Sequence, residues 1–151
     1  MARERFRMVV AVYGLLRDGD RLLLMRRAGS GYHDGELCVP AGHVDGNEDV
    51  ASALARELRE ELTIAVEPDA CRLALVAHRA PETAGDHEYL DLFFEVPHWD
   101  GTPAIGEPAK CVELCWADAD APPADTVAYV AAALREVAAG TPLLRYGWPP
   151  D

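Results

Sequence analysis

Three glutamates, Glu57, Glu60 and Glu61, are spaced so that one α-helix would carry them on a single face. Helical positions three and four apart are neighbours, so the three side chains fall within an arc of about 100°. Like charges at these spacings repel by roughly 0.2–0.5 kcal/mol per pair. One interpretation is a solvated acidic face with an Arg56–Glu60 ion pair. The other is a set of hard oxygen ligands for Mg²⁺ or Mn²⁺, with positions left open for phosphate oxygens and water.

The segment that leads into this helix favours the second interpretation. Pro40 and a run of loop residues, 42–47, precede the helix, and its acidic residues would converge beside Gly42. A loop that approaches clustered carboxylates in this way is typical of a binding site rather than of a plain solvated helix.

Residues 42–64 resemble the Nudix box, a pattern written G-x5-E-x7-R-E-U-x-E-E-x-G-U, in which U is apolar. Eight of its nine specified positions agree, namely Gly42, Glu48, Arg56, Glu57, Leu58, Glu60, Glu61 and Ile64. The departure is Thr63, which stands where the family has a glycine that ends the helix with a positive φ. Asn47 also replaces a common glycine, but asparagine tolerates the left-handed region. Because Thr63 is not a ligand, its presence concerns the helix end more than the chemistry.

The resemblance implies an α/β protein with the Nudix α/β/α sandwich fold, in which helices flank a mixed β-sheet and the box forms a loop–helix–loop. It implies that Glu57, Glu60 and Glu61 bind the metal, with the backbone carbonyl of Gly42 as a further ligand. Glu60, Glu61 and Arg56 form the expected catalytic group, and Arg56 together with Glu48 is expected to orient the loop and the helix.

Family members hydrolyse a nucleoside diphosphate linked to another group X, by attack of water at phosphorus. The divalent cation polarises the phosphoryl oxygens, neutralises the leaving pyrophosphate and acidifies water. The general base is left open between Glu60 or Glu61 and a glutamate outside the box. Glu107, Glu82 and Glu88 are the outside candidates, and each also fits a carboxylate on a surface loop.

Segments outside the box resemble MutT-like nucleoside triphosphate pyrophosphohydrolases. They are the loop 31–35, the pattern from Glu107 through Lys110 and Cys111 to Trp116, and the final helix after Pro122-Pro123. The implied reaction is Mg²⁺-dependent cleavage of a nucleoside triphosphate, either unmodified or modified, to the monophosphate and pyrophosphate. The alternatives are a nucleoside-diphosphate sugar or dinucleotide hydrolase, and a non-catalytic module that binds nucleotide.

Four further residues are weaker candidates for contact with the substrate. Arg26 and Arg27 follow a predicted strand and would meet phosphates, or would be solvated cations. His33 lies in the loop before the box and would touch the nucleotide, or would be a surface histidine. Asp91 faces inward from a predicted strand and would accept from an exocyclic amine of a base, or would lie on an open sheet face.

Hydrophobic periodicity and turn residues predict the elements that position these side chains. The Asp18-Gly19-Asp20 turn indicates a hairpin between its two flanking strands, and Glu82–Asp86 indicates a second hairpin. The second helix is expected to be capped by Asp125 or Thr126 and to end at Gly140. The predicted strands are Phe6–Leu16, Arg21–Arg27, Leu37–Pro40, Cys71–Arg79, Glu88–Val96 and Cys111–Trp116, and the predicted helices are 48/49–62 and Thr126–Ala139.

Composition restricts the class of protein further. The length of 151 residues suits one domain over 1–151, and no apolar run approaches the ~18 residues of a membrane span. A formal net charge of −12 argues against DNA or RNA duplexes as partners. It also indicates that an anionic nucleotide would arrive as its metal complex. We expect a cytoplasmic monomer or homodimer whose four cysteines are free thiols.

Overall fold

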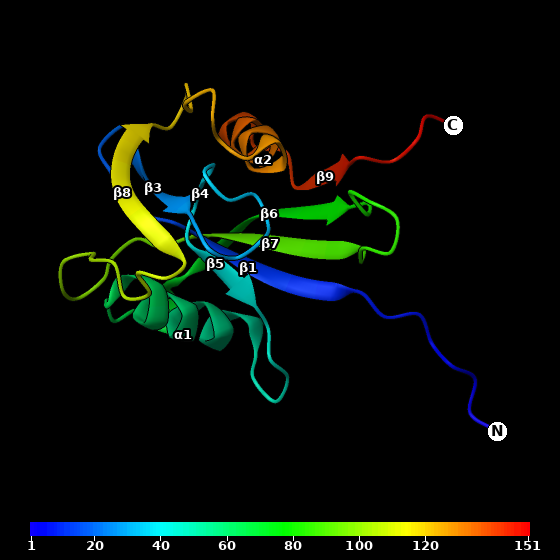
Figure 1. The fold of residues 1–151 in the computed structure, drawn as a ribbon. Helices are drawn as coiled ribbons and strands as arrows, with labels where there is room; N and C mark the ends of the chain where they lie inside the picture. Colours follow the sequence, from blue (N-terminus) through cyan, green and yellow to red (C-terminus); the bar gives the residue numbers. More distant parts are fainter.

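The computed structural model describes residues 1–151 and arranges them in layers, with one helix on each side of the β-structure (Figure 1). α1 packs on β1 and β5, and α2 packs on β6 and β9. This is the α/β/α sandwich with a mixed sheet that the resemblance implies. The strands are β1 (Val9–Leu15), β2 (Arg17–Asp18), β3 (Arg21–Arg27), β4 (Leu37–Cys38), β5 (Ala41–His43), β6 (Arg72–Arg79), β7 (Tyr89–Glu95), β8 (Cys111–Asp118) and β9 (Leu143–Tyr146), and the helices are α1 (Val50–Leu62), α2 (Ala128–Ala139) and the short 3-10 helix η1 (Pro68–Ala70).

The strands form two sheets. The first has the order β5-β1-β7-β6-β9, in which β1 and β7 are parallel, as are β6 and β9, while the other neighbours are antiparallel. The second is antiparallel, with β3 paired to β2, β4 and β8. The predicted second hairpin is confirmed as β6–β7. Neither helix is long and apolar enough to cross a membrane.

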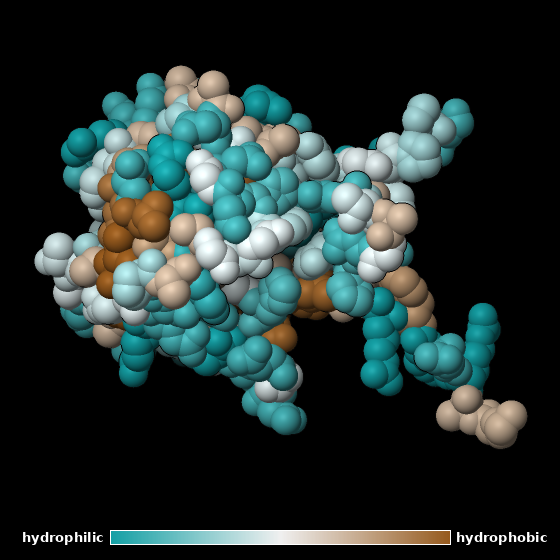
Figure 2. All heavy atoms as spheres, in the orientation of Figure 1, coloured by the Kyte–Doolittle hydropathy of each residue, from teal (hydrophilic) through white to brown (hydrophobic).

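Strand β1 supplies alternate residues to two separate cores, because successive side chains of a strand point to opposite faces. Tyr13 belongs to the cluster that includes Val130 of α2, whereas Val12 belongs to the cluster that includes Leu54 and Leu58 of α1. Both faces of β1 are therefore covered. On the outer surface, apolar atoms gather over β8, where Val112 is 60% exposed (Figure 2).

Helix α1 agrees with its predicted pattern. Its N-cap is Asp49, whose carboxylate accepts from the backbone N–H of Ser52 at 2.9 Å. Leu54, Leu58 and Leu62 are fully buried, as their four-residue spacing indicates. Their burial turns the glutamates of the next face toward β5.

Two predicted details need correction. The hairpin at Asp18-Gly19-Asp20 forms, but only through the two residues of β2, which pair with the start of β3. The longer predicted strand, Phe6–Leu16, pairs instead as β1 with β7 and β5. The cap of α2 is also different, since the helix starts at Ala128 without a side-chain cap. Asp125 instead accepts from Arg26 at 2.7 Å, and Val127 N–H donates to Leu37 O, which keeps this segment extended. Gly140 ends α2 with φ 73°, as predicted.

Beyond β2, two further short strands lie outside the predicted elements. β5 has three residues with Gly42 at its centre, and β9 follows Pro142 near the end of the chain. Neither is long enough to show a clear alternation. All four cysteines are free thiols, as expected.

Thr63 ends α1 in the left-handed conformation, with φ 59° and ψ 27°, and its N–H donates to Arg59 O. This is the conformation of the glycine that the box usually places here. A β-branched residue is strained in it by about 1–2 kcal/mol, so the helix keeps the family's ending at a cost in stability.

We therefore expect Thr63→Gly to be neutral or to raise the free energy of unfolding by up to about 1 kcal/mol, because relief of strain outweighs the added entropy of the unfolded chain. Urea denaturation measures this change in the free energy of unfolding. Thr141→Gly, at a position with no positive φ, is the matched control and should lower stability by about 0.4–1 kcal/mol. Destabilisation of both variants to the same extent would show that Thr63 is not strained.

Candidate active site

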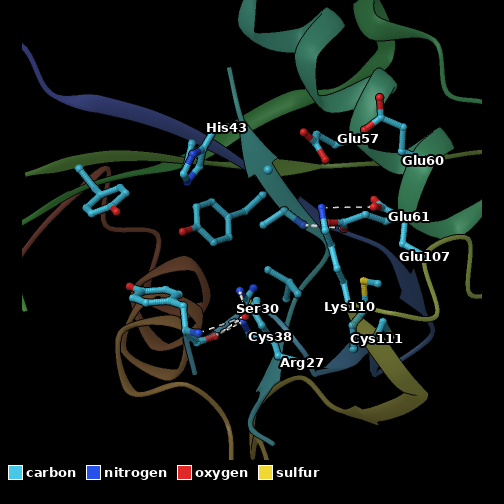
Figure 3. Close-up of a pocket in the computed structure, with 18 of the residues that line it drawn as sticks. Arg27, Ser30, Cys38, His43, Glu57, Glu60, Glu61, Glu107, Lys110 and Cys111 are labelled. Atoms are coloured by element: carbon cyan, nitrogen blue, oxygen red, sulfur yellow. Dashed lines mark hydrogen bonds and ion pairs between the residues drawn. The ribbon is translucent and has the colours of Figure 1, made fainter. Parts of the chain in front are cut away.

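A cleft of about 560 Å³ lies between β3, β5 and α1, within the size range of small-molecule sites. Figure 3 shows carboxylates gathered at one end and aromatic rings at the other. We call the first group the acidic end, formed by Glu57, Glu60, Glu61, Glu107 and Lys110. We call the second group the aromatic end, formed by Tyr13, Tyr32, His43, Tyr89, Tyr129 and Arg79.

Arg56 fixes the box loop to α1. Its guanidinium donates to both oxygens of Glu48, at 3.0 and 2.7 Å, and to the backbone carbonyl of His43 at 3.1 Å. Glu48 in turn accepts from the N–H of Asp45, and the Arg56 guanidinium holds the pKa of Glu48 below its usual range. Arg56 does not line the cleft. Arg56 and Glu48 hold the loop against the helix.

Gly42 is required by the closeness of β5 to α1. A Cβ atom at this position would overlap the carboxyl group of Glu57. The missing side chain thus leaves room for a carboxylate beside the backbone of β5, where the Gly42 carbonyl was expected to add a ligand.

The acidic end is crowded with negative charge. Glu61 is nearly buried and accepts from the N–H of Ala41 at 3.2 Å. Burial first, and the charge of Glu57 second, raise the pKa of Glu61 to about 8. Burial also raises the pKa of Glu57, opposed by Arg56, which donates to it at 2.9 Å. Glu60 is 48% exposed.

Glu107 reaches this end from a loop that docks on the last turn of α1. Gly106 N–H donates to Glu61 O at 2.8 Å, and a Cβ at Gly106 would collide with Glu60 O. The negative charge of Glu107 contributes to the raised pKa values of Glu57 and Glu61. The other outside candidates lie elsewhere: Glu82 is bound to Arg79 and Tyr32, and Glu88 to His78.

The donor set of the acidic end suits a hard divalent cation. Burial and the charge of Glu57 raise the pKa of Glu61 to about 8, and Gly42 leaves room for the Glu57 carboxylate beside β5. No three acidic, His or Cys side chains of the chain are already arranged around one cation position. The Glu57 carboxylate is paired with Arg56 at 2.9 Å.

The aromatic end is built around a buried ion pair. Arg79 donates to Asp91 at 2.7 Å, and both side chains are at most 2% exposed. The guanidinium lies between the rings of Tyr89 and Tyr129, 4.2 and 3.8 Å from their centroids. Burial raises the pKa of Asp91, and the hydrogen bond and the charge of the Arg79 guanidinium oppose that rise.

Hydrogen bonds within the aromatic end have a fixed direction. Asp91 can only accept, so the hydroxyl of Tyr13 donates to it at 3.2 Å. Tyr13 has one proton, and therefore Tyr129 donates to the Tyr13 oxygen, also at 3.2 Å. Burial raises the pKa of both tyrosines well above the usual range, which keeps both protons in place.

Two of the weaker candidates for substrate contact, Arg26 and Arg27, border the cleft but have different hydrogen-bond partners. Arg27 lines the cleft and donates to Tyr32 O and Ser30 Oγ. Arg26 also borders the cleft, but Gly35 O, Asp125 and Glu113 accept its hydrogen bonds.

Two expectations are corrected. Asp91 was predicted to read a base edge or to lie on an open sheet face, yet it is 0% exposed, stands behind the cleft wall and is used by Arg79 and Tyr13. His33 does not line the cleft, because its ring nitrogens are held 2.9 Å from Glu36 and 2.8 Å from Glu82.

Sequence reasoning missed Arg79, Lys110 and the tyrosines as site residues. A signal for Arg79 existed, because in the β6–β7 hairpin it pairs with Tyr89 and lies diagonal to Asp91. That register is set by the loop that joins β6 to β7, whose exact pairing the sequence alone does not reveal. Lys110 was visible as the only lysine.

Comparisons with known proteins agree with this geometry. The NUDIX domain family matches residues 5–137, so the chain belongs to that family. The chain is a hydrolase that acts on pyrophosphate bonds, and it is MutT-like. Among curated proteins, none matches the chain.

Several solved structures share the fold. The MutT NUDIX hydrolase from Burkholderia pseudomallei is 26% identical, with a TM-score of 0.78 over 87% of this chain and 99% of that one. The MutT protein from Methanosarcina mazei Go1 is 18% identical, with a TM-score of 0.73 over 87% and 93%. A NUDIX hydrolase from Nitrosomonas europaea is 22% identical, with a TM-score of 0.70 over 91% and 93%.

The raised pKa of Glu61 predicts a pH-dependent stability. The folded state binds this proton more tightly than the unfolded chain, whose value is near 4.5. The stabilisation is therefore complete below that value and is lost as the pH rises through about 8. We expect Glu61→Gln to melt roughly 5 °C or more above the wild type at pH 8.5, with a smaller difference at pH 5.5.

Thermal melts without divalent cations measure this difference in melting temperature. Glu60→Gln, on the exposed side of the same turn, is the matched control. Millimolar Mg²⁺ or Mn²⁺ should then raise the melting temperature of the wild type more than that of Glu61→Gln. A constant difference between wild type and Glu61→Gln across the pH range would contradict the assignment.

Proposed function

We propose that this protein is a Mg²⁺-dependent pyrophosphohydrolase that cleaves a nucleoside triphosphate to the monophosphate and pyrophosphate, with Mn²⁺ as a substitute. The observation that carries the proposal is the division of one cleft into an acidic end and an aromatic end. A nucleotide has the same division, with phosphates that need cations at one side and a flat base at the other.

The acidic end supports the phosphate chemistry. Glu57, Glu60 and Glu61 would hold the cation, which when bound polarises the phosphoryl oxygens and neutralises the leaving pyrophosphate. Arg56 holds the loop and helix in register, and Gly42 leaves the space that a carboxylate needs. These roles agree with the box residues of the family.

We assign acceptance of the proton from the attacking water to Glu107. The three box glutamates would be engaged with the cation, whereas Glu107 lies beside Glu61 on a separate loop and is 33% exposed (Figure 3). A carboxylate outside the ligand set keeps a free oxygen for a proton.

The aromatic end supports a nucleoside as the other part of the substrate. Rings of Tyr32, His43 and Tyr89 border the cleft there, and burial lowers the pKa of His43. Aromatic rings stack on any base, because every base has a π-face. The noncatalytic alternative has less support, because every box carboxylate is present.

A panel of nucleotides tests the reaction. With Mg²⁺, we expect nucleoside triphosphates to yield pyrophosphate rather than orthophosphate, and nucleoside-diphosphate sugars and dinucleotides to be poorer substrates. Product analysis by ion-exchange chromatography distinguishes the classes. Faster turnover of a diphosphate sugar or dinucleotide would replace the proposed substrate class, and no turnover of any compound would refute the proposed reaction.

Charge removal at the box tests the reaction centre. We expect Glu60→Gln and Glu61→Gln each to lower kcat at least ~100-fold, because glutamine keeps the size but not the charge that a hard cation needs. Glu107→Gln should also lower kcat by about 100-fold or more, with little change in metal affinity. Glu67→Gln, on the exposed surface, is the control. Near-normal turnover in both box variants at saturating Mg²⁺ would rule out this helix as the reaction centre.

A further inference from the structure

Lys110 is the only lysine among 14 basic side chains, and it stands at the acidic end of the cleft. Its side chain extends along the cleft toward the carboxylates (Figure 3). The ammonium nitrogen is 3.3 Å from Glu107. A compact point charge on a flexible arm suits a phosphate group that changes position during a reaction.

The other cations near the cleft are already occupied. Arg79 donates to Asp91, Tyr32 and Glu82, and Arg26 to Asp125 and Glu113. Arg27 is tied to the loop that follows β3 through Tyr32 O and Ser30 Oγ. A ligand would have to break these contacts to use those side chains.

Lys110 is held more loosely than these arginines. Its side chain is 68% exposed, and Glu107 is its one ion-pair partner. Exposed pairs of this kind contribute little to stability and exchange readily. The backbone is nevertheless fixed, since Lys110 N–H donates to Glu107 O and Lys110 O accepts from Ala28 N–H. A fixed base and a loosely held ammonium allow the arm to turn without a change in the fold.

From these observations we infer that Lys110 binds a phosphate group of the substrate and leaves Glu107 when it does so. This inference rests on the proposed function and deepens it. In the free protein Lys110 compensates the charge of Glu107, and with substrate bound its ammonium would compensate phosphate charge instead. Lys110 is thus a substrate-positioning residue, and its departure leaves an oxygen of Glu107 free.

Steady-state kinetics test the role. Lys110→Met should raise KM for the best nucleotide of the panel at least about tenfold and change kcat less than about threefold, because a charge-assisted contact is lost from ground and transition states alike. Lys110→Arg should restore KM to within about threefold of the wild type. An unchanged KM in Lys110→Met, whatever happens to kcat, overturns the inference.

Selective labelling tests it without turnover. Pyridoxal 5′-phosphate followed by borohydride labels amines, and this chain has two kinds, the Lys110 ammonium and the amino terminus on an exposed tail. A methylene-bridged analogue of ATP, GTP, CTP or UTP with Mg²⁺ should protect Lys110 at least about fivefold and leave the amino terminus unprotected. Arg72→Lys, on the exposed start of β6, adds an amine outside the cleft that should stay unprotected.

The two proposals fail in different ways. Protection of Lys110 with no hydrolysis of any nucleotide would refute the proposed function and support the phosphate contact. Hydrolysis by the wild type without protection of Lys110 by any of the four analogues, or with equal protection of all amines, would refute the phosphate contact alone.

Discussion

Burial of Leu54, Leu58 and Leu62 on one side of α1 fixes where every charged residue of the helix must stand. Once that stripe faces β1, the glutamates can only face β5, and Gly42 must lack a side chain for them to fit. Arg56 then becomes the one cation that spans both the box loop and the helix. The repulsion that remains among the carboxylates is the property that a divalent cation would use.

The two ends of the cleft are held by different kinds of interaction. At the acidic end, charges face one another across loops that are tied to the last turn of α1 by backbone hydrogen bonds. At the aromatic end, an ionised pair is enclosed by rings, with every proton in a defined place. Side chains at the acidic end can exchange one partner for another. Those at the aromatic end resist such an exchange, because a buried charge without its partner costs free energy.

The sequence allowed prediction of the features that depend on local spacing. The periodicity of α1, its glutamate face and the β6–β7 hairpin needed only neighbours along the chain. It did not allow prediction of β5, because three residues with a central glycine have no pattern of their own and are strands only beside β1. Asp91 was correctly placed facing inward, yet its partner Arg79 depends on the register that the β6–β7 loop sets. Site placement of Glu107 and Lys110 likewise depends on a loop that docks on α1 from far along the chain.

The double use of β1 has a consequence for protein engineering. Tyr13 belongs to the core, stacks on Phe93 at 4.3 Å and also borders the aromatic end, so a change made there for altered base preference would disturb packing. Tyr32 and His43 border the same end but belong to neither core. A library of variants aimed at new nucleotides should therefore change His43 first, because Tyr13 is part of the core and the Tyr32 hydroxyl accepts from the buried Arg79.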